Sequence, residues 1–410
     1  MKNKSILILG GGASGLAAAV QAGQMGARVT ILERSDRVGK KLLATGNGRS
    51  NLANMGEPCY FGDADFARRV LQSMPVADVL GFFDSLGLPT RADASGRVYP
   101  ACNQAAAVLD VLRLHLERVH ARVITGAQAQ AILPEKDGYC VRTADAAYHA
   151  DCVLVCCGGL AAPKLGAVNA YGLLTALGCK LAAPAPALAP IETEKAPLRG
   201  LSGLRLPATL TLCDGDQPIA RTQGEVLFAD YGVSGVCAMQ LARDAQRLLS
   251  ARRQPMLYLD FSPAMGIDAY RMARLEPGRP DDNLPAVRAF LKRRAQILPS
   301  DALLLGALPR LLRERMAAYR GEELARMLCA YPLRVTGVRG YDQAQVTQGG
   351  IDPADFDPAT MACKKHPGLY ACGEILNVDG DCGGYNLQFA FASGILAGRA
   401  AGRSAAKGRE

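Results

Sequence analysis

An apolar stretch that runs straight into a glycine-rich turn lies near the start of the chain and constrains the fold more than any other feature. Residues 5–9, Ser-Ile-Leu-Ile-Leu, predict a strand, and Gly10, Gly11 and Gly12 follow at once. A helical stretch and a second apolar strand over residues 28–32 come next. This order of strand, glycine turn, helix and strand is typical of the unit that holds a dinucleotide pyrophosphate. It therefore predicts an α/β, Rossmann-like nucleotide-binding domain.

The residues of this turn have separate physical roles. Gly10 permits the tight turn, Gly12 lets the backbone approach a pyrophosphate, and Gly15 lets the helix pack closely on the strand. The helix N-terminus offers free N–H groups and a partial positive charge to phosphates. Glu33, at the end of the second strand, is placed to accept hydrogen bonds from the adenosine ribose. The alternative is a glycine-rich turn without function. The predicted contacts of this half are Gly10, Gly12, Ala13, Ser14, Gly15, Glu33 and Arg34.

The segment after Glu33 indicates which dinucleotide to expect. An acid at this position disfavours a ribose 2′-phosphate and leaves FAD or NAD. Residues 37–52 form a long loop rich in glycine, amide and basic groups, where a nicotinamide enzyme would continue into another βα repeat. Such a loop can bind a pyrophosphate and the polar edge of a flavin, so we predict FAD; the alternative is a solvated basic loop. The candidate ligands are Lys40, Lys41, Thr45, Gly46, Asn47, Arg49 and Asn51.

The C-terminal part of the chain supplies a second cluster of cofactor motifs. Residues 367–374 predict a short strand ending in Gly-Glu, and a glycine pair at 383–384 precedes a helix expected from Phe389 to about Ala401. N–H groups at that helix start would stabilise negative charge on a reduced flavin, and Glu374 would accept from ribityl hydroxyls. A plain helix N-cap is the alternative. The candidates here are Gly373, Glu374, Gly384, Asn386 and Leu387.

These motifs resemble those of the HI0933-like family of bacterial flavoproteins. The family includes a bile-acid-inducible flavoprotein, and many members are labelled aminoacetone oxidase family FAD-binding enzymes. The resemblance implies a discontinuous FAD-binding domain of the glutathione-reductase type. In that architecture Gly158 brings backbone close to the cofactor, and the strand around Ala129, expected over residues 123–132, offers backbone to the adenine. The matching segments are residues 39–52, 224–235, 346–351 and 368–394, which together span nearly all of the chain.

The domain organisation follows from where the cofactor motifs fall. A proline-rich stretch, residues 181–190, disfavours helix and marks the entry into an insertion. Alternating apolar residues then indicate antiparallel strands at residues 208–213, 219–222, 225–228 and 256–261. A later segment has helical periodicity at residues 286–298 and 302–319. The predicted parts are residues 1–185 (first part of the FAD-binding domain), 186–262 (inserted β-rich domain), 263–328 (helical insert), 329–345 (return to the β-rich domain) and 346–410 (second part of the FAD-binding domain).

Composition limits the other classes of protein. No apolar run approaches the length of about 18–20 residues that a membrane span needs, and the chain enters its first strand at once, so we expect neither a span nor an export signal. Thirteen cysteines without a regular framework fit a reducing cytoplasm, which is the expected location. The four histidines are scattered along the sequence, so no metal site is predicted.

The formal net charge is +9, and arginines concentrate at residues 291–294 and 310–320. A basic face of this kind can meet nucleic acid, anionic substrates or water. Acids are interleaved with these arginines, and aromatic residues able to stack on bases are few. We therefore expect a solvated face and regard nucleic acid as an improbable partner. The sequence carries no indication of oligomeric state.

Three classes of function follow. The first is an FAD-dependent oxidoreductase that passes hydride from NADH or NADPH, through flavin N5, to an activated carbon–carbon double bond of an apolar, steroid-like enone. With no second glycine fingerprint, the nicotinamide would bind transiently. Tyr385 is the candidate proton donor, with Tyr231 and Arg49 as weaker alternatives and packing against the flavin as the non-catalytic interpretation. The second class is a flavin-containing RNA-binding, RNA-modifying or regulatory protein that uses the basic helical insert. An oxygen-dependent amine oxidase ranks last.

Overall fold

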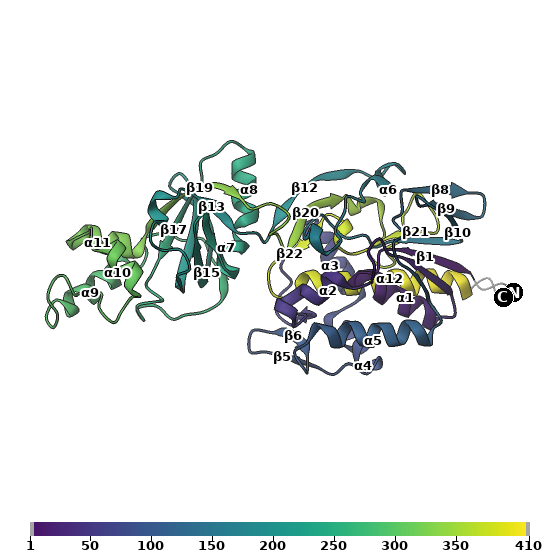
Figure 1. Cartoon of the computed structure of the whole chain (residues 1–410), viewed down its shortest axis with the longest axis horizontal. Helices are drawn as coiled ribbons and strands as arrows, with labels where there is room; N and C mark the ends of the chain where they lie inside the picture. Colours follow the sequence, from purple (N-terminus) through teal and green to yellow (C-terminus); the bar gives the residue numbers. More distant parts are fainter. Residues whose placement is uncertain (1–3, 407–410) are drawn as a thin grey trace. The chain divides into compact units, whose positions relative to one another are not determined.

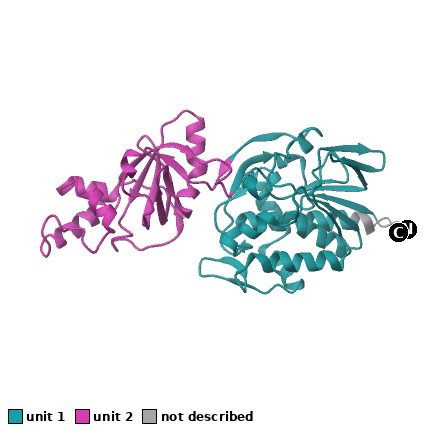
Figure 2. Cartoon of the chain, in the orientation of Figure 1, with its two compact units in different colours: residues 1–185, 346–410 teal, residues 186–345 magenta. Residues whose placement is uncertain are grey.

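The structure is a computed structural model that describes residues 4–406. The chain forms two compact units, coloured separately in Figure 2. Unit 1 combines Met1–Ala185 with Val346–Glu410, and unit 2 is Pro186–Gln345. No helix among the described residues is long and apolar enough to cross a membrane.

A five-stranded parallel sheet forms the centre of unit 1, in the order β21-β11-β1-β2-β7. Leu7 of the central strand lies opposite Thr30 on one side and Val153 on the other. Leu7 and Ile8, which point to opposite faces of the sheet, are both buried, as expected for a strand covered on both faces. The predicted α/β, Rossmann-type fold is therefore confirmed. The strands are β1 (Ser5–Leu9), β2 (Arg28–Leu32), β7 (Arg122–Ile124), β11 (Cys152–Val155) and β21 (Leu369–Ala371).

Two helices that are far apart in sequence, α1 (Ala13–Gln24) and α12 (Tyr385–Ala406), pack closely against each other (Figure 1). Small residues of α12 make this approach possible. A Cβ on Gly394 would lie 2.3 Å from the backbone oxygen of Ser14, and one on Gly398 would lie 2.4 Å from that of Ala18. This packing brings the C-terminal motifs beside the N-terminal glycine turn.

Smaller elements surround this core. A three-stranded antiparallel meander, β8-β9-β10, and three further small sheets, β3-β6-β5, β12-β20 and β22-β4, surround the core among the described residues. These strands are β3 (Ala53–Asn54), β4 (Tyr60–Gly62), β5 (Thr90–Ala92), β6 (Arg97–Pro100), β8 (Ala131–Glu135), β9 (Gly138–Arg142), β10 (Ala147–Ala150), β12 (Leu181–Ala187), β20 (Val346–Ile351) and β22 (Val378–Gly380). The remaining helices and 3₁₀ turns are α2 (Lys40–Ala44), η1 (Thr45–Gly48), α3 (Ala64–Ser73), α4 (Val76–Ser85), α5 (Ala105–Arg118), η2 (Pro163–Leu165), α6 (Gly172–Thr175), η4 (Pro353–Asp355) and η5 (Gly373–Ile375).

Unit 2 is built on a seven-stranded antiparallel sheet in the order β14-β17-β19-β13-β16-β15-β18, and β14 also pairs with β15. Its core includes Leu210, Leu257 and Leu333, which are fully buried. The strands are β13 (Ile191–Thr193), β14 (Arg205–Asp214), β15 (Gln217–Ala229), β16 (Gly232–Ser234), β17 (Met256–Asp260), β18 (Ala273–Leu275) and β19 (Tyr331–Val338). The helices are η3 (Ala196–Leu198), α7 (Val236–Gln240), α8 (Ala242–Ser250), α9 (Leu284–Arg294), α10 (Arg310–Met316) and α11 (Gly321–Cys329).

Two expected elements of unit 1 have different bounds. The strand predicted over residues 123–132 is wrong, because Gly126 adopts a φ of +69° and turns the chain between β7 and β8. Ala129 therefore lies in a connection and not in a strand. The last helix begins at Tyr385, four residues before the expected Phe389, which places Asn386 and Leu387 in its first turn.

Unit 2 also departs from the expected pattern. The helix predicted over residues 302–319 begins only at Arg310, because Gly306, with a φ of +75°, and Pro309 interrupt it. The region expected to be β-rich also contains two helices, α7 and α8. Gly224, which separated two predicted strands, lies inside the single strand β15. A Cβ there would come within 3.0 Å of the Cys237 side chain on α7, so the glycine makes room for that helix.

Candidate functional site

The glycine turn after β1 combines tight packing with open space. Gly10 has a φ of +103°, and a Cβ on it would lie 2.5 Å from the backbone oxygen of Cys156. A Cβ on Gly15 would lie 2.0 Å from the backbone oxygen of Gly10. By contrast, a Cβ on Gly12 would meet no described atom within 4 Å. The first two glycines hold the turn against the sheet, and the third borders the space that a pyrophosphate would take.

The carboxylate of Glu33 is held beside this turn by backbone amides. Its Oε2 accepts a hydrogen bond from the N–H of Gly11 at 2.8 Å, and its Oε1 accepts from Ser35 at 2.7 Å. A carboxylate oxygen has further acceptor capacity, so the half-buried group can still bind ribose hydroxyls. The neighbouring Arg34 is exposed, while Ala13 and Ser14 begin α1, whose first N–H groups have no intrahelical partner.

Residues from both ends of the chain meet at Glu374. Its Oε2 accepts from the Lys41 ammonium at 2.7 Å, and its Oε1 accepts from the N–H of Thr347 at 2.8 Å. The Thr347 hydroxyl, fully buried, accepts from the N–H groups of Leu160 and Ala161 at 2.8 and 3.0 Å. Thr347 was not predicted as a site residue, although it lies within the family-like segment 346–351. The network joins α2, β20, η5 and the loop after β11.

Other residues of the basic loop shape its backbone. Lys40 forms an ion pair with Asp36, and the Thr45 hydroxyl donates to the backbone oxygen of Leu42 at 2.7 Å. Asn47 has a φ of +54°, and Gly46 before it has a φ of +57°. Two consecutive left-handed residues turn the loop sharply, and asparagine and glycine are the residues that tolerate this conformation best.

The end of this loop carries two buried polar atoms without a hydrogen-bond partner among the described residues, Ser50 Oγ and Asn51 Oδ1. A Cβ on Gly384 would lie 2.6 Å from that Asn51 oxygen, so the two segments are in contact. Arg49 nearby places its guanidinium 5.3 Å from the ring centre of Tyr99. Buried polar atoms are nearly always satisfied in proteins, so this pair marks a place where a polar ligand fits.

The turn into α12 is also built on glycine. Gly383 and Gly384 have φ values of +132° and +107°, and a Cβ on Gly384 would lie 2.4 Å from the backbone oxygen of Ala53. The side chain of Asn386 accepts from the N–H of Gly380 at 2.8 Å and donates to its carbonyl at 2.7 Å. The Asn386 amide therefore fixes the loop before the helix.

Asn54 and Gln388 add a buried link that sequence reasoning missed. The N–H of Asn54 donates to Gln388 Oε1 at 3.0 Å, and its side-chain amide donates to the backbone oxygen of Gly383 at 2.7 Å. Leu387, which lies in the sequence between the two partners of Asn54, is half-buried against the core. Both residues lie inside or next to the family-like segments, which is the signal that could have identified them.

Tyr385 is the first residue of α12 and is half-buried. Its backbone oxygen accepts from the Tyr60 hydroxyl at 2.9 Å, and the two rings meet edge to face with centres 5.8 Å apart. Burial, reinforced by nearby Cys59 and Asp381, raises the pKa of the Tyr385 phenol above its usual value of 10. The phenol therefore keeps its proton across the physiological range. Tyr231, the weaker candidate, lies in unit 2, where Arg339 stacks on its ring at 4.8 Å.

The strand ends behind the glycine turn carry two close thiols. Cys156 Sγ and Cys372 Sγ lie 3.1 Å apart, and both residues are buried. Burial raises the pKa of the Cys156 thiol well above its usual range, in keeping with a core residue. Beside them, Gly373 donates its N–H to the Ser393 hydroxyl at 3.0 Å, and Gly158, with a φ of +71°, has open space where a Cβ would be.

The arrangement fits an FAD molecule. A dinucleotide needs space for its phosphates, N–H donors and fixed acceptors. Gly12 and Gly158 border open space, and the N-terminus of α1 offers donors. Acceptors are the Glu33 carboxylate and the Asn51 Oδ1 atom, which has no partner among the described residues. Apart from Ala129, the predicted cofactor-binding residues lie in four segments of unit 1: the glycine turn and start of α1, the loop after β2, the loop after β11, and the segment from η5 to the first turn of α12. Ala129 lies in the connection between β7 and β8, two residues after Ala127, whose N–H donates to the backbone oxygen of Glu33.

This fold and this site define an FAD-dependent oxidoreductase built on a Rossmann-type domain. The chain belongs to the HI0933-like protein family. The model of this family, described as the HI0933-like protein Rossmann domain, matches residues 4–400. The predicted family and the predicted cofactor, FAD, are thereby confirmed.

Curated relatives cover almost the whole chain. The 3-dehydro-bile acid delta(4,6)-reductase of Clostridium scindens is 36% identical over 412 residues, which cover 96% of this chain and 98% of that protein. The ribosomal RNA dihydrouridine synthase of Escherichia coli is 25% identical over 405 residues, 96% of each. Among solved structures, 3-ketosteroid delta1-dehydrogenase from Sterolibacterium denitrificans superposes with a TM-score of 0.53 at 12% identity, covering 98% of this chain and all of that one. This last likeness concerns the fold.

Proposed function

We propose that this protein is a reductase that passes hydride from NADH or NADPH, by way of FAD, to a carbon–carbon double bond conjugated with a carbonyl group in an apolar, steroid-like substrate. The observation that carries the proposal is the 36% identity, over 96% of this chain, to a protein named as a bile acid reductase. Identity of this extent across both units supports a related substrate class as well as a shared cofactor.

The residues of unit 1 would bind and orient the cofactor. Gly12 and the N-terminus of α1 would hold the pyrophosphate, and Glu33 would hold the adenosine ribose. The glycine pair before α12 would direct that helix's N–H groups and its positive dipole end at the flavin. When bound, FAD supplies hydride transfer at N5.

Tyr385 would supply the proton that reduction of an enone requires opposite the hydride. Its raised pKa keeps the phenol protonated. The hydrogen bond from Tyr60 to its backbone oxygen, together with the edge-to-face ring contact, restricts its position. Protonation and a fixed position support the assignment; hydrogen-bond reach of the substrate carbon is the remaining requirement for a general acid, and the Tyr385→Phe variant below tests it.

The direct test is anaerobic. The purified protein with bound FAD is mixed with NADH or NADPH, and flavin bleaching is followed by absorbance. The reduced protein is then mixed with a panel of steroid enones and simpler unsaturated ketones. Bleaching followed by reoxidation with an enone is the expected result. Failure of both nicotinamides would overturn the proposed donor, and failure of every enone to reoxidise reduced flavin would overturn the proposed substrate class.

Replacing Tyr385 by Phe tests the proton donor. We expect turnover to fall by about 10²- to 10⁴-fold with FAD content unchanged, because the ring contact is kept and the proton is lost. Tyr148→Phe, a half-buried tyrosine on β10, is the matched control and should leave turnover unchanged. Full turnover in Tyr385→Phe would remove this residue from the mechanism.

A second candidate is modification of RNA, which the 25% identity to ribosomal RNA dihydrouridine synthases favours. Dihydrouridine is uridine with its conjugated double bond saturated, so both named relatives add hydrogen to a double bond next to a carbonyl. Against RNA binding, several arginines of the helical insert are engaged: Arg288 pairs with Glu322, and Arg310 pairs with Glu314. Tight binding of ribosomal RNA that weakens steeply with salt would favour this candidate over the steroid reductase.

A further inference from the structure

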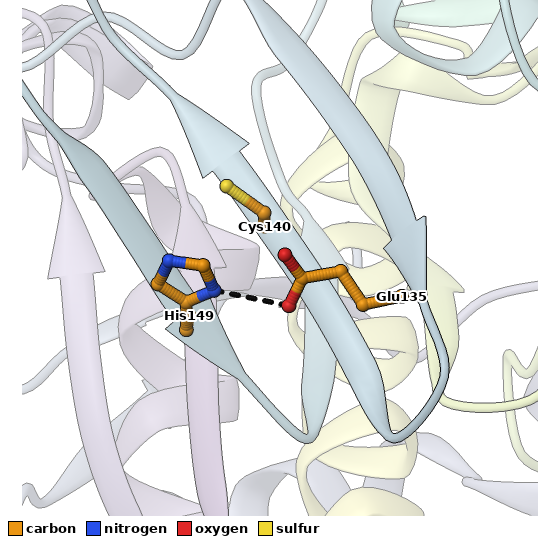
Figure 3. Close-up of side chains that lie close together, drawn as sticks. All are labelled: Glu135, Cys140 and His149. Carbon is orange, nitrogen blue, oxygen red and sulfur yellow. Dashed lines mark hydrogen bonds and ion pairs between the residues drawn. The ribbon is translucent and has the colours of Figure 1, made fainter.

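Three metal-ligating side chains lie together on the meander of unit 1, one on each strand (Figure 3). Glu135 ends β8, Cys140 lies in the middle of β9, and His149 lies in β10. The ligand atoms of the three residues all lie within 4.8 Å of one another. His149 Nδ1 is 3.0 Å from Glu135 Oε2.

The strand register explains why these side chains share one face. Cys140 lies directly opposite His149 on β10 and opposite Leu133 on β8. Residues that are opposite in antiparallel strands point to the same face, and so do residues two apart along one strand. Glu135, two residues after Leu133, therefore joins the other two. The histidines and acids are scattered in sequence, and the hydrogen-bond register brings this set together.

The three groups form a ligand set of definite chemistry. A thiolate sulfur, an imidazole nitrogen and a carboxylate oxygen together suit zinc, which binds these ligands at about 2.3, 2.0–2.1 and 2.0–2.2 Å. Tetrahedral ligands at such distances are separated by roughly 3.5 Å, which lies between the 3.0 Å from His149 Nδ1 to Glu135 Oε2 and the 4.8 Å within which all three ligand atoms lie. We propose that Glu135, Cys140 and His149 form a zinc-binding site with water as the fourth ligand.

Burial in the cluster favours a metal over other uses of the same groups. The side chains of Glu135 and His149 are 44% and 64% exposed, and an exposed ion pair of this kind contributes little to stability. Cys140 is 6% exposed. It is too enclosed to attack a bulky substrate as a nucleophile, but its sulfur is within reach of an ion held by the two outer ligands. The inner thiol and the two outer groups thus complete one site that is open to water on its outer side.

Zinc binding would tie the three strands of the meander together. The bound ion would link the end of β8, the middle of β9 and the strand β10. Along the chain these three strands are joined by two turns. Because the metal would bind the folded meander and not the unfolded chain, it would stabilise that part of unit 1. We expect hydrogen exchange of β8–β10 to slow with zinc, while exchange of β17 in unit 2 stays unchanged.

The experiment uses the FAD-loaded protein after treatment with a chelator. Zinc chloride is titrated calorimetrically, and the ligand set is read from zinc X-ray absorption. We expect one zinc per chain with one sulfur neighbour. Cys140→Ser should remove the sulfur signal and weaken zinc binding by at least about tenfold. Cys102→Ser, which replaces an exposed cysteine elsewhere in unit 1, is the matched control and should bind zinc like the wild type.

His149→Gln keeps the test decisive if the buried Cys140→Ser variant does not fold, because His149 lies on the surface. It should weaken zinc binding to a similar extent while FAD content stays at the wild-type level. The proposal is overturned if the wild type shows no saturable zinc binding. It is also overturned if His149→Gln binds zinc as tightly as the wild type, or if X-ray absorption finds no sulfur in the wild-type site.

Discussion

Two pairs of glutamates, one pair in each unit, have opposite surroundings. In unit 1, Glu33 and Glu374 are half-buried at the cofactor site and accept hydrogen bonds from backbone N–H groups. In unit 2, Glu322 and Glu314 lie on the surface and pair with arginines of the helical insert. The residue types are the same, but their surroundings assign them different roles. Glu33 and Glu374 are therefore the acids that we propose for the cofactor site, whereas Glu322 and Glu314 neutralise arginines of the helical insert.

We propose that the redox function lies in unit 1. The proposed site draws on the glycine turn, the basic loop, β20 and the start of α12, which are held together by hydrogen bonds between the N-terminal and C-terminal parts of unit 1. Unit 2 has an apolar core of its own and a surface of ion pairs. We expect substitutions in unit 1 to affect FAD first, and comparable substitutions in unit 2 to affect local stability.

The largest effect should come from the glycine turn. Gly15→Ala would place a methyl group 2.0 Å from the backbone oxygen of Gly10, so the backbone of the turn or of α1 would have to shift. We expect a loss of about 3 kcal/mol or more of stability and purification without FAD. Gly12→Ala is the matched variant, because its methyl group meets no described atom within 4 Å. It should fold nearly normally but bind FAD more weakly, as measured by flavin content and calorimetric titration. Normal FAD content in Gly15→Ala would contradict the packing argument.

A smaller effect is expected from Lys41→Met. The substitution leaves the Glu374 carboxylate, whose side chain is 19% exposed, without its cation. We expect a cost on the order of 1–3 kcal/mol and a lower affinity for FAD, measured by urea unfolding and flavin release. Arg288→Met in unit 2 removes one arginine from the exposed Glu322 and should change stability far less. Equal effects of the two substitutions would remove the distinction between the units.

The smallest effect concerns pH and comes from a buried acid of unit 2. Burial raises the pKa of Asp260 above its usual value, although hydrogen bonds from Ser262 and Asn283 oppose the shift. A folded-state pKa above the unfolded one means that the protonated group contributes stability below about pH 4. That contribution is lost as the pH rises through the folded-state pKa.

Asp260→Asn should therefore flatten the pH dependence of stability in unit 2. The measurement is hydrogen exchange of β14 and β17 between about pH 4 and pH 7, corrected for intrinsic exchange rates. We expect the wild type to lose protection in this window relative to the variant. Parallel pH profiles for the two proteins would show that Asp260 does not titrate with folding.

Much of the cofactor region could be predicted from sequence because its signals are local. Gly10, Gly12 and Gly15 occur within six residues, and their spacing alone predicts the strand–turn–helix geometry that the structure has. Unit 2 was harder to interpret. Separate strands were predicted on either side of Gly224, but this glycine lies inside β15, where the missing side chain makes room for α7. A contact between two elements leaves no local pattern in the sequence.

The same reasoning explains which site residues were missed. Thr347, Asn54 and Gln388 act through hydrogen bonds to residues more than 180 positions away, and polar residues of these types have many possible roles. The expected strand at Ala129 was wrong because one glycine with a positive φ outweighed the strand preference of its neighbours.

The sequence by itself indicated the class of fold and the cofactor, because both depend on short-range spacing of glycines, strands and an acid. The family followed from the resemblance of segments along the whole chain. Tertiary structure alone decided that Lys41, Glu374 and Thr347 form one network. It also decided that Glu135, Cys140 and His149 share one face of the meander. Strand register and helix packing bring together side chains whose separation along the chain carries no information about their distance in space, and that is the physical reason for the difference.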